Sequence, residues 1–115
     1  MRRTILYFLL FEAATFVAAS LIHAGVFVSG YEHWKARIAE SVIAVALFAA
    51  AAWAWLRPQS ARTAGLAGQG FALFATLVGI FTIVLGVGPR TVPDVIYHAA
   101  IVAVLIWGLM VARRA

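Results

Sequence analysis

The sequence predicts an all-α integral membrane protein in which four transmembrane helices form an up-down bundle. Hydrophobic residues make up 65% of the 115 residues and charged residues only 11%, and the mean hydropathy is +1.01. A soluble domain of this size needs a polar surface that such a composition does not supply. Four apolar runs of about 20 residues each match the length that crosses roughly 30 Å of hydrocarbon.

The four runs cover residues 4–28, 31–56, 65–87 and 93–112. Backbone polar groups cannot stay unpaired in lipid, so each run is expected to be a helix. The connections are short, which makes consecutive helices antiparallel neighbours within a single domain, residues 1–115. The start of the chain resembles a signal peptide, but Glu12 interrupts its apolar run. We therefore expect a retained first helix.

The Lys and Arg residues predict the orientation of the bundle. One side would carry six of them and the other side three: Arg2, Arg3, Arg57, Arg62, Arg113 and Arg114 against Lys35, Arg37 and Arg90. The positive-inside rule then places both termini in the cytoplasm, and the expected location is a bacterial inner membrane. The lipid bilayer is the expected partner, and a homo-oligomer or another membrane protein is a further option.

The same composition excludes several classes of function. The chain has no cysteine, so disulfides and thiolate chemistry are absent. The basic residues sit at segment ends and form no patch, which argues against nucleic acid as a partner. No nucleophile–base pair or phosphate-binding loop can be recognised, so the sequence does not decide whether the chain is an enzyme.

Local patterns predict where the helices begin and how closely they pack. Ser29 with Glu32, and Thr91 with Asp94, each place an acid three residues after a hydroxyl. This is the spacing of a capping box, and it predicts the starts of the second and fourth helices. In the third segment small or hydroxyl residues lie roughly on one face, where they would let helices approach closely. They are Ala72, Thr76, Gly79 and Gly86.

All three histidines are expected near one end of the bundle, together with a carboxylate from the segment 29–40. His23, His98 and Glu40 should lie roughly 8, 9 and 14 Å below the outer surface at about 1.5 Å per residue. His33 should lie above them. Ionisable side chains are costly in a bilayer and usually face the bundle interior. The sequence therefore predicts that His23, Glu40 and His98 converge in the outer half of the bundle.

A metal site is the first interpretation of this convergence. Imidazole and carboxylate ligands suit zinc, copper or iron. His23, Glu40 and His98 would bind the ion, with His33 as a fourth ligand or a gate. Glu32 and Asp94 would orient the imidazoles, and Arg37 would lie beside the site. Binding should weaken below about pH 6.5, where free histidine becomes protonated. Such a site would serve metal handling or membrane redox chemistry.

Two further interpretations use the same residues. A b-type haem could take His23 and His98 as axial ligands, because they lie at similar depth on neighbouring helices. Glu40 and Arg37 would then face the haem propionates or remain structural. The other interpretation is a polar network without any metal, in which Arg37 pairs with Glu40 three residues away on the same helix.

Glu12 supports an interpretation of its own. It is expected to face the bundle interior, because a charge facing lipid at mid-bilayer costs at least about 2.5 kcal/mol. It could be hydrogen-bonded to Thr76 at similar depth, or it could carry protons.

Chain length, four helices and a lone carboxylate in the first helix resemble the small multidrug resistance exporters. The resemblance is one of layout, and it implies a small proton-coupled transporter that uses Glu12. No motif in the other three segments matches that family, and the charge bias argues against inverted assembly.

An accessory membrane subunit without chemistry is the remaining alternative. Such a subunit would need neither His23 nor His98.

Overall fold

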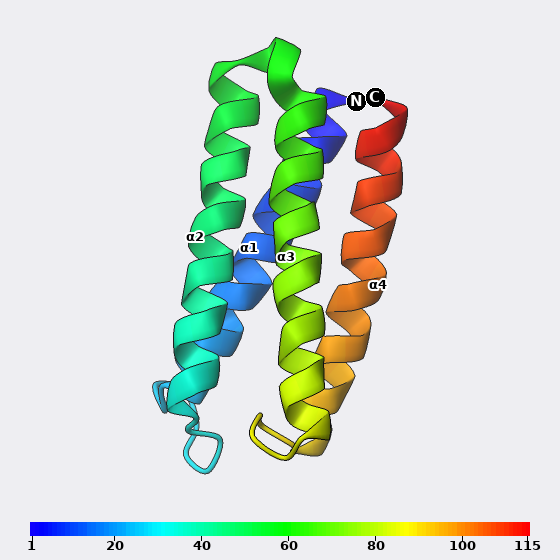
Figure 1. Ribbon diagram of the computed structural model, residues 1–115. Helices are drawn as coiled ribbons and strands as arrows, with labels where there is room; N and C mark the ends of the chain where they lie inside the picture. Colours follow the sequence, from blue (N-terminus) through cyan, green and yellow to red (C-terminus); the bar gives the residue numbers. More distant parts are fainter.

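The structure is a computed structural model that describes residues 1–115. Its elements are α1 (Arg2–His23), α2 (Trp34–Leu56), the short 3-10 helix η1 (Pro58–Ser60), α3 (Ala61–Val84) and α4 (Val92–Arg114). Figure 1 shows both termini beside the α2–α3 connection, at what we call the terminal end. The α1–α2 and α3–α4 turns lie at the opposite end, which we call the loop end. The predicted all-α four-helix bundle is confirmed.

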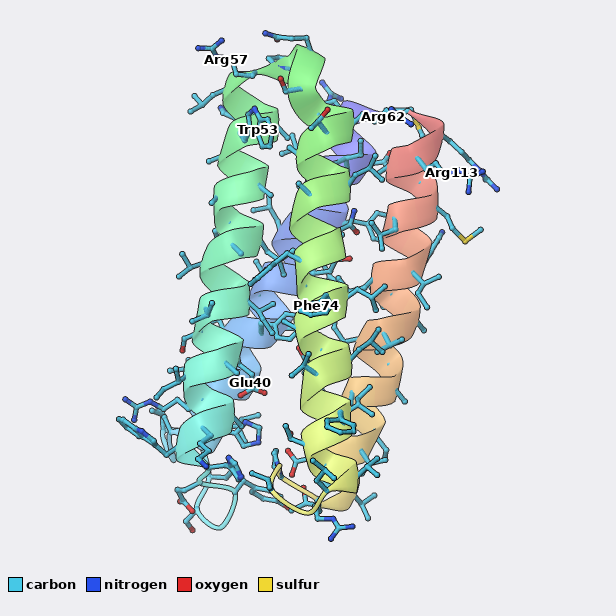
Figure 2. The ribbon with its side chains drawn as sticks, viewed as in Figure 1. Glu40, Trp53, Arg57, Arg62, Phe74 and Arg113 are labelled. Atoms are coloured by element: carbon cyan, nitrogen blue, oxygen red, sulfur yellow. The ribbon has the colours of Figure 1, made fainter.

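Consecutive helices pack against one another, and α1 also contacts α4 and α3 and so closes the bundle. The core consists of 17 buried apolar residues, many of them alanines. Large apolar side chains remain on the outside, among them Phe11, Phe74 and Trp107, and Figure 2 shows the position of Phe74 on α3. All four helices are long and apolar enough to cross a membrane.

Small residues of α3 do face a neighbouring helix, but they are not all the predicted ones. Ala72 and Thr76 are buried as expected. The closest approach is at Gly68, where an added Cβ would lie 2.5 Å from the Cβ of Ala50 on α2. Gly86, which was assigned to the same face, lies beyond the end of the helix. Only glycine fits at position 68, because any side chain would push α2 away.

The helices end earlier at the loop end than the apolar runs predict. α1 ends at His23 and not at 28, because Gly25 adopts a φ of 80°. The Gly25 amide donates to the Ile22 carbonyl (3.0 Å), and the Val26 amide donates to the Leu21 carbonyl (3.1 Å). This pair of bonds is a Schellman motif, which satisfies the last carbonyls of a helix.

α3 ends in the same way, at Val84 and not at 87. Gly86 has a φ of 84°. The Gly86 amide donates to the Ile83 carbonyl (3.0 Å), and the Val87 amide donates to the Thr82 carbonyl (2.9 Å). At the terminal end α3 also begins four residues earlier than predicted, directly after η1.

One predicted cap is confirmed and the other is wrong. Thr91 caps α4, and Asp94 completes the capping box. Ser29 does not begin α2, which starts at Trp34 with His33 as its cap. The backbone around Gly30 takes a φ of 99°, so the turn continues past Ser29. Glu32 accepts hydrogen bonds from the Gly30 amide instead of completing a capping box.

Candidate functional site

His23 is held between two carboxylates in the loop-end half of the bundle. Its Nδ1 lies 2.6 Å from Oε1 of Glu40, and its Nε2 lies 2.8 Å from Oδ1 of Asp94. The exposed fractions of His23, Glu40 and Asp94 are 5%, 6% and 8%. Three helices thus contribute one side chain each to a buried chain of two hydrogen bonds, which we call the Glu40–His23–Asp94 triad. Figure 2 shows Glu40 near the loop end, far from the arginines of the terminal end.

Local structure at the helix ends positions His23 and Asp94. His23 is the last residue of α1, where the Schellman turn at Gly25 stops the helix. Its carbonyl also accepts a hydrogen bond from the His33 amide at 2.9 Å, which ties the end of α1 to the start of α2. Asp94 lies in the first turn of α4 and uses its two oxygens differently. Oδ2 accepts from the Thr91 amide and hydroxyl, while Oδ1 faces His23.

The hydrogen bonds fix the number of protons that the triad holds. An ionised carboxylate only accepts hydrogen bonds, whereas an imidazole nitrogen donates or accepts according to its protonation. Two bonds therefore need two bridging hydrogens. These belong either to an imidazolium between two carboxylates or to a neutral imidazole beside one protonated acid. Both arrangements carry one net negative charge, and they interconvert when one proton moves along a hydrogen bond.

No basic side chain pairs with this charge. The only ion pairs in the protein are those of His23 with its two carboxylates. The Arg37 guanidinium stacks over the Trp34 ring at 4.3 Å, so the Arg37–Glu40 pair considered from the sequence does not form. Burial without a counter-cation favours the uptake of one more proton, because a neutral group costs less to desolvate.

His33 serves as a structural clasp at the loop end. Its Nδ1 accepts the Ala36 amide at 3.1 Å, so Nδ1 carries no hydrogen. Its Nε2 then carries the proton and donates to the Val87 carbonyl at 3.1 Å. Both ring nitrogens are occupied, and the bond to Val87 joins the two turns of the loop end. The ring centroid of His33 lies 6.3 Å from that of His23.

His98 faces away from His23. Its Nδ1 donates to the Asp94 carbonyl one turn earlier, at 2.6 Å. Its Nε2 is turned toward α3, 3.7 Å from where a Cβ on Gly79 would lie. His98 makes no side-chain bond to His23 or Glu40. The expected convergence therefore joins His23 directly to Glu40, while His98 only shares a cavity with Glu40.

Two cavities lie on either side of the triad. A cavity of about 200 Å³ between α2, α3 and α4 is lined by Glu40, His33 and His98, and Lys35 lies in its wall. A second cavity of about 480 Å³ between α1 and α4 is lined by His23 and Asp94. The two cavities share no lining residue. The triad therefore forms the polar connection between them.

The chemistry of these donors differs from that of a metal centre. No three His, Asp or Glu side chains are arranged to hold an ion. Both nitrogens of His23 face carboxylate oxygens, and His23 and His98 line different cavities. They therefore do not face each other across a common space, as two axial haem ligands would. Glu32 bonds to Gly30 and contacts no imidazole.

Glu12 lies deeper in the bundle and is fully buried, so the prediction that it faces the interior is confirmed. Both of its carboxyl oxygens lack a hydrogen-bond partner, as does Oε1 of the buried Gln69. The Thr76 hydroxyl bonds to the Ala72 carbonyl, so the expected Glu12–Thr76 bond is absent. An unpaired carboxylate in such surroundings is far more costly than the neutral acid.

Two polar pairs near the triad were missed by the sequence interpretation. The Ser20 and Ser41 hydroxyls are 2.7 Å apart and join α1 to α2. The Thr15 hydroxyl lies 3.1 Å from the Tyr97 hydroxyl and joins α1 to α4. Thr15 and Tyr97 line the same cavity as His23 and Asp94. The sequence did contain a signal for two of these residues. Ser20 lies three residues before His23, and Tyr97 lies three residues after Asp94. This spacing places two side chains on the same face of a helix.

Comparison with protein families, with curated proteins and with solved structures gives no match to this chain. Its function is therefore inferred from its own residues.

Proposed function

We propose that this chain is an integral membrane protein that binds protons at the Glu40–His23–Asp94 triad and passes them between the two cavities beside it. The observation that carries the proposal is the single buried imidazole bonded to a carboxylate on each side, at 2.6 and 2.8 Å. Such a chain suits proton transfer, because the proton moves along hydrogen bonds that already exist. Proton relays of Asp, Glu and His are typical of membrane pumps and transporters.

Support for a membrane location comes from the outer surface. The helices have 22, 23, 24 and 23 residues, which is about 33–36 Å at about 1.5 Å per residue. That length matches a bilayer core. Tryptophans lie near both ends and are exposed, as expected of side chains at the headgroup level. They are Trp34 at one end and Trp53, Trp55 and Trp107 at the other.

The transfer itself follows from the hydrogen count. A proton that enters from the cavity between α2, α3 and α4 is taken up by the Glu40 carboxylate. The Nε2–H of His23 then passes its proton to Asp94, which releases it to the α1–α4 cavity. His23 then carries its hydrogen on Nδ1, opposite the protonated Glu40. The bridging hydrogens are restored when the His23 side chain swings into a cavity, loses the Nδ1 hydrogen to water, gains one on Nε2, and returns with a bare Nδ1 that accepts from the Glu40 hydroxyl. His23 is therefore the moving part of the relay.

Glu12 is the inner proton site in this proposal. The cavity that His23 and Asp94 line extends to Thr15 and Tyr97, and the Thr15 hydroxyl donates to the Glu12 carbonyl at 2.8 Å. Glu12 thus lies one turn beyond the cavity wall, on the side away from the triad. Both cavities lie in the loop-end half of the bundle, so a proton that crosses the membrane must also pass Glu12. In this proposal Glu12 takes up and releases that proton when the bundle opens toward the terminal end.

Proton flux into liposomes tests the proposal. The purified protein is reconstituted with a pH-sensitive dye inside, and a membrane potential drives proton entry. We expect flux through the wild type and a loss of at least about tenfold in His23→Gln, whose amide can bond to both carboxylates but does not titrate. Glu32→Gln is the matched control, because Glu32 lies at the same end of the bundle outside the triad.

Equal flux in the wild type and in His23→Gln would overturn the proposal. Flux that is lost equally in Glu32→Gln would show that the loop end as a whole is needed, and it would also count against the triad.

A metal ion or haem b is the alternative that the sequence predicted. The sequence predicted His23, Glu40 and His98 as the metal ligands, with His33 as a fourth, and His23 with His98 as the haem ligands. Of these residues, His33, Glu40 and His98 line one cavity, whereas His23 lines the other. His33 has both ring nitrogens engaged, and Oε1 of Glu40 is bonded to His23. Only Nε2 of His98 and Oε2 of Glu40 are left to bind an ion in that cavity. We expect elemental analysis and an absorption spectrum of the purified protein to show neither. A stoichiometric metal that is lost in His98→Ala would favour the alternative.

A further inference from the structure

Besides the two cavities at the triad, a groove lies at the terminal end of the bundle. It runs between α1 and α2 and has a volume of about 620 Å³. Arg2 and Arg3 stand at its mouth, and its walls are apolar, with Leu6, Leu10 and Phe48 along its length. A groove with cationic residues at its mouth and apolar walls is complementary to an amphiphile with an anionic head group.

The charge at this mouth has no protein partner. The chain has four acidic residues, of which Glu32, Glu40 and Asp94 are at the loop end and Glu12 is buried. The Arg2 guanidinium lies 5.7 Å above the Trp55 ring, which holds it beside the groove. No guanidinium group of the terminal end forms an ion pair within the chain, so an anion from outside can bind there.

We propose that this groove binds one anionic phospholipid. Its phosphate accepts hydrogen bonds from Arg2 and Arg3, since guanidinium forks match phosphate oxygens. One acyl chain lies along Leu6, Leu10 and Phe48. The inference rests on the membrane location in the proposed function but not on proton transfer. A soluble anion would fill only the mouth of the groove, whereas a phospholipid fills the mouth with its phosphate and the apolar walls with an acyl chain.

The other basic residues of this end provide a matched control. Arg62 and Arg113 contact each other, since Nε of Arg62 donates to the Arg113 carbonyl at 3.4 Å. Arg113 and Arg114 line neither this groove nor the two cavities beside the triad. The double variant Arg113→Gln/Arg114→Gln removes the same charge as Arg2→Gln/Arg3→Gln at the same end of the bundle.

Native mass spectrometry of the detergent-solubilised protein measures the retention of added lipid. We expect the wild type to retain phosphatidylglycerol in preference to phosphatidylcholine. Retention should fall by on the order of 30-fold in Arg2→Gln/Arg3→Gln and stay unchanged in Arg113→Gln/Arg114→Gln. Ala52→Phe, which fills the groove from α2, should lower retention with all arginines intact.

Equal retention of the two lipids, or equal losses in the two arginine variants, would overturn the inference. Displacement of the lipid by millimolar inorganic phosphate alone would show that the site takes a free anion. His23→Gln separates this inference from the proposed function, because it should retain phosphatidylglycerol as the wild type does while losing proton flux.

Discussion

At the scale of the residue, the decisive feature is that one imidazole serves two buried carboxylates. Removal of His23 would leave the two carboxylates without a cation, and breaking a buried pair in this way costs about 3–5 kcal/mol. Asp94 is the most constrained member, since the same carboxyl group completes the capping box of α4 and bonds to His23. The two roles can be separated by mutation.

We expect Asp94→Asn to destabilise the fold more than Thr91→Ala does. Thr91→Ala removes the cap alone, at about 1 kcal/mol. Asp94→Asn also weakens a charge-assisted bond to His23, at about 1.5–3 kcal/mol more. The free energy of unfolding in mixed micelles measures both. Equal costs would mean that the His23–Asp94 bond contributes nothing to stability.

The sequence predicted the depth of the site but not which side chains share it. His23 and Glu40 were expected together and are bonded. His98 was expected at the same place because of its depth, yet it faces α3. Rotation about the helix axis decides between these outcomes. Helices that are apolar all round carry little information about that rotation, since any face can meet lipid.

At the scale of the element, two glycines set the helix ends that position His23 of the triad and the partner of His33. Gly25 ends α1 just after His23, and Gly86 ends α3 beside Val87, the partner of His33. The apolar runs continue through both glycines, so hydropathy alone extended the helices too far. A glycine followed by valine, as at 25 and 86, is the local signal for a Schellman end.

We expect Gly25→Ala and Gly86→Ala each to cost about 1–2 kcal/mol, because an L-residue at positive φ is strained. Gly70→Ala is the control. Gly70 lies within α3 with open space around it, so alanine there should be neutral or stabilising. Unfolding in mixed micelles compares the three variants. A loss at Gly70 as large as at Gly25 would contradict the conformational explanation.

At the scale of the whole molecule, charge divides the two ends. The terminal end carries arginines and the loop end carries the carboxylates of the triad, as Figure 2 shows for Glu40 against Arg57, Arg62 and Arg113. The sequence predicted this division well, because it depends on composition near the helix ends and not on side-chain packing. The two cavities could not be predicted, since each depends on how side chains from several helices pack together.

We expect both the C-terminus and the turn at 57–62 to face the cytoplasm. The basis is the excess of Lys and Arg at the terminal end. Reporter fusions after Ala115 and within that turn should both report a cytoplasmic location, and a fusion at Gly30 should not. An external signal from either of the first two positions would reverse the orientation and with it the direction of proton entry.

NMR spectroscopy of protein labelled with ¹⁵N in its histidine rings tests most directly whether the Glu40–His23–Asp94 triad forms. The triad requires a bridging hydrogen on each side of the His23 ring. We expect two low-field proton signals from His23, with the Nδ1 signal shifted in Glu40→Gln and the Nε2 signal shifted in Asp94→Asn. The absence of a low-field bridging proton on either side of the His23 ring, or signals that neither variant moves, would show that the triad does not form.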